Sequence, residues 1–378
     1  MKRPNVIWVY PDQLRYDALS ASGNPICETP NMDWLADNGA NFTDAHTSFP
    51  LCCPFRASTM TGLYAHKNGM VSNHYPIDLD LPHYLPKVMG EAGYRTAWIG
   101  KWHLNGGMKF DIVPKEYRLG FDEFIGYSRG HHYIDAIYYR DDDPTPHTSD
   151  KFEPVFQTDQ LIDFMERATD DGQPFMGMIC YGIPHPPVDM QPDESKYRYS
   201  PDQIDLPDTV PEYMQEDAKV FRAKYYGLVN AVDTEIGRIT DYLKKKGLFE
   251  DTVFIVVSDH GEMAGEFGLY EKIVSYRASS HVPLLINYPR LITQGTLVDQ
   301  LVDPSVDVTA TILDLCGIEV PETMDGSSLK TMLEDGKDDQ YKDHVYYQAL
   351  QVADHVCEVV DKEDRKPFGQ RGIRTKES

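Results

Sequence analysis

Four polar residues directly follow two apolar runs of the sequence, and their types suit a metal ion. They are Asp12 and Gln13, after the run 5–10 (NVIWVY), and Asp259 and His260, after the run 252–258. The two aspartates are 247 positions apart, but the carboxyl ends of parallel strands share one edge of a sheet. These four side chains would form an oxygen-rich site for a divalent cation. Either aspartate alone is equally well explained as a cap; two pairs at equivalent strand ends favour the metal.

The segment 51–62 (LCCPFRASTMTG) has the residues of an anion site. Pro54 can begin a helix that runs towards Gly62, which places Cys52 at the positive end of that helix. Arg56 adds a fixed charge with a planar fork of donors. The alternative interpretation is that Cys52 and Cys53 are small apolar side chains in a core, which is the commoner fate of a cysteine.

The elements that must position these residues indicate an α/β fold. Continuous apolar runs, each ending in a polar loop, are typical of buried parallel strands. They occupy residues 5–10, 95–99, 175–181 and 252–258. Helical segments separate them, and the clearest is 216–246, with apolar residues at three- and four-residue steps and Gly247 as a C-terminal stop. We therefore predict a large, mostly parallel sheet sandwiched by helices. Further helices are predicted at 81–92 and 306–316, and long surface loops at 139–154 and 189–211.

Length, charge and composition exclude several classes of protein. The 378 residues carry a formal net charge of −24, which disfavours non-specific binding to nucleic acid. No apolar run approaches the ~20 residues that cross a bilayer, and no signal region precedes the first predicted strand. We therefore expect a cytoplasmic protein without a membrane segment. The six cysteines are too sparse for a disulfide framework and are expected to be mostly reduced thiols.

The segment around Cys52 resembles the signature of the sulfatase family, in the alkaline phosphatase superfamily: Cys-x-Pro-x-Arg followed by a short helix with Thr-Gly. Cys52, Pro54 and Arg56 match it, whereas Phe55 stands where the family usually has Ser. Further segments are similar to family motifs and occur in the family's order. They are 4–15, 100–104 (GKWHL), 184–187 (PHPP), 258–262 (SDHGE), 268–272 (GLYEK), 282–284 (VPL), 311–318 and 325–329. The resemblance thus covers nearly the whole chain.

This resemblance implies a specific chemistry at residue 52. Cys52 would be oxidised to formylglycine by a formylglycine-generating or an anaerobic sulfatase-maturating enzyme. The aldehyde hydrates to a geminal diol, one hydroxyl of which attacks sulfur. The second hydroxyl then loses its proton, which reforms the aldehyde and expels inorganic sulfate. An unmodified thiolate has no such escape and would be trapped as a sulfated adduct.

The resemblance also implies a role for each polar residue in the matched motifs. Lys101 and Lys272 would hold the sulfate oxygens, and His185 would protonate the leaving oxygen. Arg56 would steady the formylglycine hydrate, and His103 would orient or deprotonate it. The implied metal ligands are Asp12, Gln13, Cys52, Asp259 and His260. Ca²⁺ is the first choice, with Mg²⁺ or Mn²⁺ behind it. Two departures from many family members weigh against calcium: Gln13 replaces a second Asp and lowers the ligand charge, and His260 replaces an Asn with an imidazole, which accepts softer metals.

The resulting expectation is a sulfuric ester hydrolase that removes sulfate from a monoester, with a small sulfated carbohydrate as one candidate substrate. Two alternatives stay open. One is a phosphonate monoester or phosphodiester hydrolase with the same site, since the superfamily handles both phosphorus and sulfur. The other is a non-catalytic metal- and anion-binding protein in which Cys52 remains a thiol, an alternative that Phe55 keeps open.

The domain prediction is a sulfatase catalytic domain at 1–340 and, at 341–378, the start of a C-terminal subdomain that the sequence does not complete. Residues 371–376 resemble the first strand of that subdomain. Such a strand would have an exposed edge, and pairing of two copies in a homo-oligomer is one way to cover it.

One polar loop has two interpretations. It either contacts the leaving group of the substrate or is ordinary solvated surface, which is the commoner case. Its residues are His131, His132, Tyr133 and Arg140.

Overall fold

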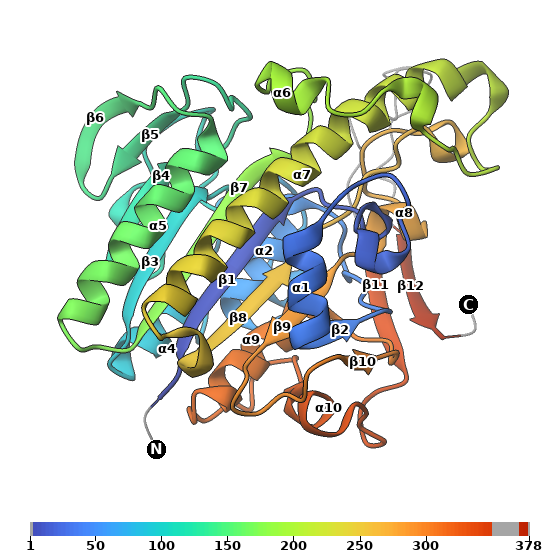
Figure 1. The fold of residues 1–378 in the computed structure, drawn as a ribbon. Helices are drawn as coiled ribbons and strands as arrows, with labels where there is room; N and C mark the ends of the chain where they lie inside the picture. Colours follow the sequence, from blue (N-terminus) through green and yellow to red (C-terminus); the bar gives the residue numbers. More distant parts are fainter. Residues whose placement is uncertain (1–2, 350–369, 377–378) are drawn as a thin grey trace, which may run out of the picture.

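The computed structural model describes residues 3–349 and 370–376, and these form a main sheet of ten strands (Figure 1). The strand order is β10-β2-β9-β8-β1-β7-β3-β4-β5-β6. The parallel centre consists of β8 (Thr252–Val257), β1 (Asn5–Asp12), β7 (Phe175–Pro184), β3 (Arg95–Lys101) and β4 (Glu123–Tyr127). At one margin, β9 (Leu284–Asn287) and β2 (Ala40–Phe42) form an antiparallel pair, and β10 (Thr296–Val298) lies outside β2. At the other margin, β5 (Ile137–Arg140) and β6 (Asp143–Thr148) form an antiparallel pair. The predicted α/β fold with a mostly parallel sheet is confirmed.

Helices cover both faces of the sheet because side chains along each central strand point alternately to opposite sides. In β1, Val6, Trp8 and Tyr10 join one core, and Ile7 and Val9 join the other. The first core is covered by α2 (Cys52–Thr61), α4 (Leu85–Glu91), α9 (Pro304–Leu315) and α10 (Lys330–Asp335). The second is covered by α1 (Pro30–Asn38), α5 (Glu153–Asp170) and α7 (Gln215–Lys245), which lie in front of the sheet in Figure 1.

The long helix α7 agrees with the helix predicted at 216–246 to within one residue at each end. Gly247 follows it with φ +68°, a left-handed conformation that glycine adopts without strain and that ends helices. The loop predicted at 189–211 contains the one-turn helix α6 (Asp193–Lys196) and a short 3₁₀ turn, Pro201–Gln203. Two other one-turn helices are α3 (Ala65–Asn68) and α8 (Arg277–Ser280).

The predicted helix at 306–316 is α9, which begins two residues earlier than the apolar pattern indicated. The Asp303 side chain accepts a hydrogen bond from the backbone N–H of Ser305 at 3.0 Å, and Pro304 fills the first helical position. These are an N-cap and a first-turn residue of the preferred types. The helix predicted at 81–92 is α4, which begins later, at Leu85.

The prediction of a long surface loop at 139–154 is wrong. The chain forms the hairpin β5–β6 there, and α5 begins at Glu153. Strand β6 is the outer edge of the sheet, and most of it is exposed. Pro144 and Pro146 are tolerated because an edge strand needs hydrogen-bond partners on one side only. The Asp and Pro residues that suggested a loop therefore belong to an edge strand.

A separate antiparallel pair is formed by β11 (His344–Ala349) and β12 (Gln370–Thr375), the latter being the strand predicted at 371–376. The Gln348 backbone N–H donates to the Ser48 carbonyl at 2.7 Å, and Arg374 Nη2 donates to the Ser275 carbonyl at 2.8 Å. These bonds attach the pair to the segment before α2 and to the loop before α8. The domain boundary at 340 stays a prediction.

The described cysteines are unpaired thiols, as predicted, and Cys357 lies outside the described residues. In the part of the chain that the structure describes, no helix combines the length and apolarity needed to cross a membrane.

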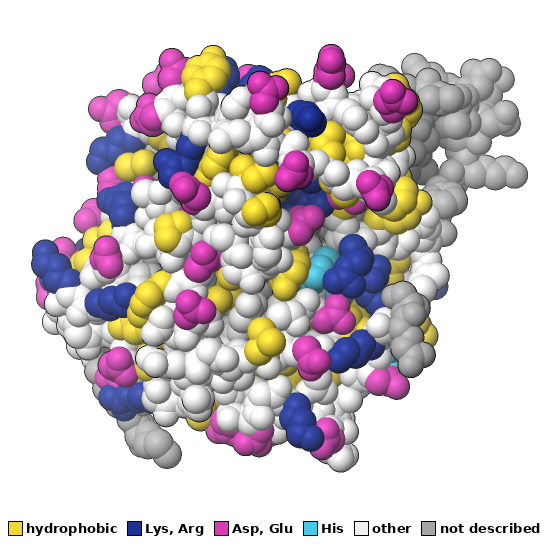
Figure 2. Space-filling model, turned by 45° about the vertical axis from the view of Figure 1, so that its right-hand side comes forward, with side chains coloured by type: hydrophobic (Ala, Val, Ile, Leu, Met, Phe, Trp, Pro, Cys, Tyr) yellow, Lys and Arg dark blue, Asp and Glu magenta, His cyan; other side chains and the backbone are white. Residues whose placement is uncertain are grey.

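On the face drawn in Figure 2, acidic groups stand singly with basic groups between them, and no continuous basic patch is present. Several cations lie inside the molecule. Among them, the side chains of Arg56 and Lys101 are 0% exposed, and that of Lys272 is 7% exposed. Positive charge able to hold an anion is therefore found in the interior.

Candidate active site

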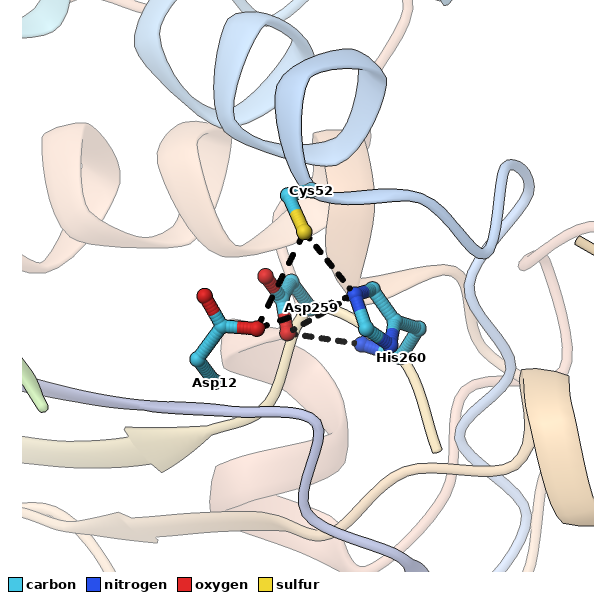
Figure 3. A group of neighbouring side chains, drawn as sticks. All are labelled: Asp12, Cys52, Asp259 and His260. Atoms are coloured by element: carbon cyan, nitrogen blue, oxygen red, sulfur yellow. Dashed lines mark hydrogen bonds and ion pairs between the residues drawn. The ribbon is translucent and has the colours of Figure 1, made fainter. Parts of the chain in front are cut away.

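Four side chains meet at the carboxyl edge of the parallel sheet (Figure 3). Asp12 ends β1, Asp259 and His260 follow β8, and Cys52 begins α2. Their ligand atoms lie within 4.8 Å of one another, and all four residues are buried. β1 and β8 are neighbouring parallel strands, so residues distant in sequence reach the same edge.

Hydrogen bonds fix the ends of β1 and β8 to each other. The backbone N–H groups of Gln13 and His260 both donate to Asp259 Oδ1, each at 3.0 Å. Ser258 Oγ donates to the Pro11 carbonyl at 2.9 Å. Gln13 has φ +69°, the left-handed conformation that non-glycine residues seldom adopt and that clusters at functional sites. The two strand ends thus form one rigid platform under Cys52.

Arg56 lies one turn after Cys52 on the fully buried helix α2, so the two side chains share a face of that helix. Its guanidinium makes four contacts: Nη2 to Asp12 Oδ2 (2.9 Å) and Asp259 Oδ2 (3.4 Å), and Nη1 to the Lys101 carbonyl (2.8 Å) and Cys180 Sγ (2.9 Å). Phe55 lies on the core side instead, where its ring packs edge-on against Tyr10 with centroids 5.6 Å apart. The unusual Phe therefore belongs to the core.

Lys101 reaches the site from the end of β3. Gly100 before it has φ +106°, and a Cβ there would collide with the Cys180 carbonyl of β7, so only glycine fits. Lys101 Nζ donates to Asp12 Oδ2 at 2.6 Å and lies 3.9 Å from Cys52 Sγ. The close packing of β3 on β7 thus brings a buried ammonium next to the helix start.

The acids and the thiol of this cluster are shifted by the cations around them. Burial alone would raise the pKa of Asp12, but Lys101 and Arg56 hold that pKa well below its usual range. Burial and Asp12 raise the pKa of the Cys52 thiol, yet Lys101 and His260 bring it below its ordinary value. Position 52 is therefore a place that favours negative charge.

The donor set fits a divalent cation. His260 Nδ1 lies 3.0 Å from the Gly261 carbonyl, which can only accept, so Nδ1 carries the proton and Nε2 offers a lone pair. Nε2 lies 3.2 Å from Cys52 Sγ, 3.8 Å from Asp12 Oδ1 and 3.7 Å from Asp259 Oδ1. Lone pairs that converge at these distances inside a protein repel one another unless a proton or a cation lies between them. Burial lowers the pKa of His260, but Asp259 and Cys52 raise it to about 8. Without a metal the imidazole therefore tends to hold a proton, and a bound cation would take the place of that proton.

Lys272 is the third cation of the site, and it contacts Gln13 and His185. Its Nζ donates to Gln13 Oε1 at 2.7 Å, to His185 Nε2 at 2.8 Å and to Glu271 Oε2 at 2.8 Å. Gln13 Nε2 donates in turn to the buried Glu262, which fixes the direction of the amide. Gln13 therefore contacts the carboxylate platform through its backbone and Lys272 through its side chain.

His103 has φ +66°, and its carbonyl accepts from Cys53 Sγ at 2.7 Å. Both ring nitrogens are shielded from solvent, and neither has a hydrogen-bond partner within the described ranges. Burial, with Lys101 next, holds the pKa of this imidazole well below its usual range. A shielded neutral imidazole without partners is ready to bond to a group that enters the site.

One residue of the polar loop belongs to the site, although the sequence did not separate it from its neighbours. The His131 ring stacks on the His185 ring with centroids 3.6 Å apart, and its Nε2 lies 3.3 Å from Lys101 Nζ. His132 instead faces Phe110, and Arg140 bonds to Gln160. The only available signal was that His131 follows the end of a parallel strand, β4, which was not predicted.

Known proteins of similar sequence match most of this chain. The family model described as Sulfatase matches residues 4–318. The ulvan-active sulfatase of Formosa agariphila is 32% identical over 338 residues, which cover 88% of this chain and 65% of that protein. The chain therefore spans a little less than two thirds of the length of this relative.

Solved structures show the same fold. A protein solved in complex with its substrate D-glucosamine-2-N,6-O-disulfate aligns with a TM-score of 0.82 and 25% identity, over 99% of this chain and 87% of that one. A phosphonate monoester hydrolase from Silicibacter pomeroyi aligns with a TM-score of 0.78 and 26% identity, over 92% of this chain and 80% of that one.

Proposed function

The chain belongs to the sulfatase family, and on this premise we propose that it hydrolyses the sulfate ester of a small sulfated substrate, with sulfated carbohydrates as the first class to test. The observation that carries the proposal is the convergence of three buried cations on the N-terminus of helix α2, where residue 52 lies. Arg56, Lys101 and Lys272 surround position 52 and its two carboxylate neighbours. A monovalent sulfate ester entering there meets fixed donors.

The two lysines suit the sulfate oxygens. Lys101 Nζ and Lys272 Nζ now donate to the ring nitrogens of His131 and His185, which are weak partners compared with an anion. A sulfate oxygen could take over the bond of Lys272 to His185, and it could accept the Lys101 hydrogen that is directed at Cys52 Sγ, 3.9 Å away. The contacts of Lys101 with Asp12 and His131 and of Lys272 with Gln13 would stay in place. Binding would therefore need no rearrangement of the carboxylate platform.

A divalent cation would be held by Asp12, Gln13, Asp259, His260 and residue 52, with Ca²⁺ as first candidate and Mg²⁺ or Mn²⁺ next. We propose Cys52 as the residue that a maturation enzyme converts to formylglycine. When bound, the cation would supply a Lewis acid beside residue 52. Arg56 would keep Asp12 and Asp259 ionised, so that both carboxylates could bind the cation. His103 would accept or orient a proton at residue 52.

His185 is the proposed proton donor to the leaving oxygen. Its Nδ1 lies 2.6 Å from the Pro186 carbonyl and therefore carries hydrogen, so Nε2 is the atom that faces Lys272 and the site. Burial, His131 and Lys272 hold the pKa of His185 well below its usual range. The negative charge of a bound sulfate would raise this pKa and so favour the protonated form in the complex.

The test couples modification to turnover. The protein is coexpressed with a maturation enzyme, the peptide around Cys52 is analysed by mass spectrometry, and hydrolysis of 4-nitrophenyl sulfate, glucosamine 6-sulfate and a 4-nitrophenyl phosphonate monoester is measured. We expect formylglycine at 52, preferential sulfate release, and loss of turnover in Cys52→Ala by at least about 10³-fold. The matched control is Cys53→Ala, whose thiol contacts the His103 carbonyl and does not face the carboxylates.

Two results would overturn the proposal. A large preference for the phosphonate would support the second candidate function, which the phosphonate monoester hydrolase relative keeps in view. An unchanged thiol at 52 with no turnover of any ester would support a metal- and anion-binding protein.

A further inference from the structure

His131 makes specific contacts on one face of its ring and at both of its nitrogens. Its Nε2 lies 3.3 Å from Lys101 Nζ, and its Nδ1 lies 3.0 Å from Tyr133 Oη. Its ring is stacked on that of His185, with a centroid separation of 3.6 Å and an interplanar angle of 9°. His131 therefore touches a proposed sulfate-binding lysine and the proposed proton donor at the same time.

The hydrogen-bond directions fix the form of this imidazole. An ammonium can only donate, so Nε2 of His131 must accept from Lys101 and Nδ1 must carry the hydrogen. That hydrogen goes to Tyr133 Oη, whose own proton is donated to the carbonyls of His185 (2.6 Å) or Gly182 (2.9 Å). The chain of bonds thus runs from Lys101 through His131 and Tyr133 to the backbone of His185.

We propose that His131 is a positioning residue for sulfate-ester cleavage. It holds the His185 ring in the orientation that donates a proton to the leaving oxygen, and it holds the Lys101 ammonium towards the sulfate. The inference rests on the proposed function. The stack limits rotation of His185 about its side-chain bonds, and the Tyr133 hydroxyl fixes the backbone that carries it. A neutral ring is required, because a protonated His131 would have no lone pair for Lys101 and would repel both neighbours.

Two variants separate the two contacts. His131→Gln keeps an oxygen that can accept from Lys101 but removes the stack on His185. His131→Phe keeps the stack but removes the acceptor. We expect His131→Gln to lower kcat about 10- to 100-fold on glucosamine 6-sulfate, whose poor leaving group needs a proton, and less than about threefold on 4-nitrophenyl sulfate, whose leaving group does not. We expect His131→Phe to raise KM and the inhibition constant of free sulfate about five- to tenfold on both substrates.

The control is His132→Gln at the neighbouring position, whose ring lies against Phe110 outside the site and whose kinetics should equal those of the wild type. In a His185→Ala background, His131→Gln should produce no further loss on the poor leaving group, because it acts through His185. If His131 had a purely structural role, His131→Gln would instead lower kcat on both substrates equally, in the wild type and in the His185→Ala background. Equal losses, or none, would overturn the inference.

A second readout does not need turnover. In ¹⁵N-histidine spectra of the full chain, His131 and His185 should each show the neutral form with hydrogen on Nδ1, and His131→Gln should shift the His185 signals while His132→Gln should not. Unshifted His185 signals would overturn the inference even if sulfate hydrolysis is found. Absence of sulfate turnover with shifted signals would overturn the proposed function and leave the placement of His185 by His131 intact.

Discussion

Carboxyl groups that are equally buried have different pKa values, because their neighbours differ. Asp12 contacts two cations, and its pKa is held well below the usual range. Glu153, at the start of α5, is 1% exposed and accepts a hydrogen bond from Tyr127 Oη at 2.6 Å, but it contacts no cation among the described residues. Burial raises the pKa of Glu153 to about 7. The first acid is prepared to stay ionised, and the second is about half protonated near pH 7.

We predict that Glu153→Gln changes how stability depends on pH. The ordinary pKa of Glu is 4.5 and the folded value is about 7, so between them the folded state holds a proton that the unfolded state has released. The free energy of unfolding of the wild type therefore falls through this window as pH rises, and stays lowered above it. Glutamine does not titrate, so the variant should gain about 2 to 3 kcal/mol relative to the wild type between pH 5 and pH 8.

Urea unfolding at the two pH values measures this difference. The control is Glu166→Gln, an exposed acid paired with Lys246 on the surface, which should show a nearly constant offset from the wild type. A constant offset for Glu153→Gln as well would contradict the prediction.

Among the elements, β3 is tightly constrained in its position. It pairs with β7 on one side and β4 on the other, and at Gly100 the backbone of β7 leaves no room for a Cβ. The residue that follows is Lys101, so a shift of this strand end moves a site cation. Stability and site geometry are therefore coupled at one glycine.

We predict that Gly100→Ala is costly and that Gly93→Ala is not. Both glycines have positive φ, +106° and +90°, but an added Cβ collides with the Cys180 carbonyl only at Gly100, and at Gly93 it meets open space. Gly93→Ala should cost about 1 to 2 kcal/mol of strain with unchanged kcat/KM. Gly100→Ala should cost about 2 to 5 kcal/mol and lower kcat/KM, because Lys101 is displaced. Equal unfolding free energies and equal activities of the two variants would contradict this.

The elements that could be predicted are those with a local signal. The strands β1, β3, β7 and β8 are continuous apolar runs, and α7 has a long apolar period, so both patterns appear in the sequence itself. The short strands β2 and β10 have three residues each, and β6 contains two prolines. Their pairing is decided by neighbours that are distant in sequence, and no local pattern reports it.

At the scale of the whole molecule, the candidate site joins segments that span most of the described chain. Residues that directly follow a predicted strand could be placed together, because the edge of a parallel sheet collects them. The stack of His131 on His185 could not be predicted, because it joins loops after β4 and β7, and strand β4 was not identified. The contact of Gln13 with Lys272 depends equally on where two separate loops cross. The catalytic and metal-binding roles of these residues stay predictions.

We predict that chelation destabilises the protein. Asp12 and Asp259 are buried, and their oxygens converge with His260 Nε2, so a bound cation would stabilise the folded state. At a free concentration about 100 times its Kd, the cation should add about 2.7 kcal/mol to the free energy of unfolding. Urea unfolding after chelator treatment, with Ca²⁺, Mg²⁺ or Mn²⁺ restored separately, measures this gain and identifies the metal.

Asp259→Asn should abolish the response to added metal. Asp233→Asn is the control, since this buried acid bonds to Asn31 and Met32 away from the site and should leave the response intact. Identical unfolding of the wild type with and without each metal would contradict the prediction.

The guanidinium of Arg56 bonds to groups from β1, β3 and β7 and to the aspartate that follows β8, four adjacent strands of the sheet. During synthesis the last of these groups, Asp259, leaves the ribosome only some time after residue 259 has been made. Until then the pocket lacks one wall, and the sulfur of Cys52, 1% exposed in the finished molecule, is not yet enclosed. We therefore expect an agent that has to reach this sulfur to do so before β8 joins the sheet, because the aspartate after that strand completes the pocket.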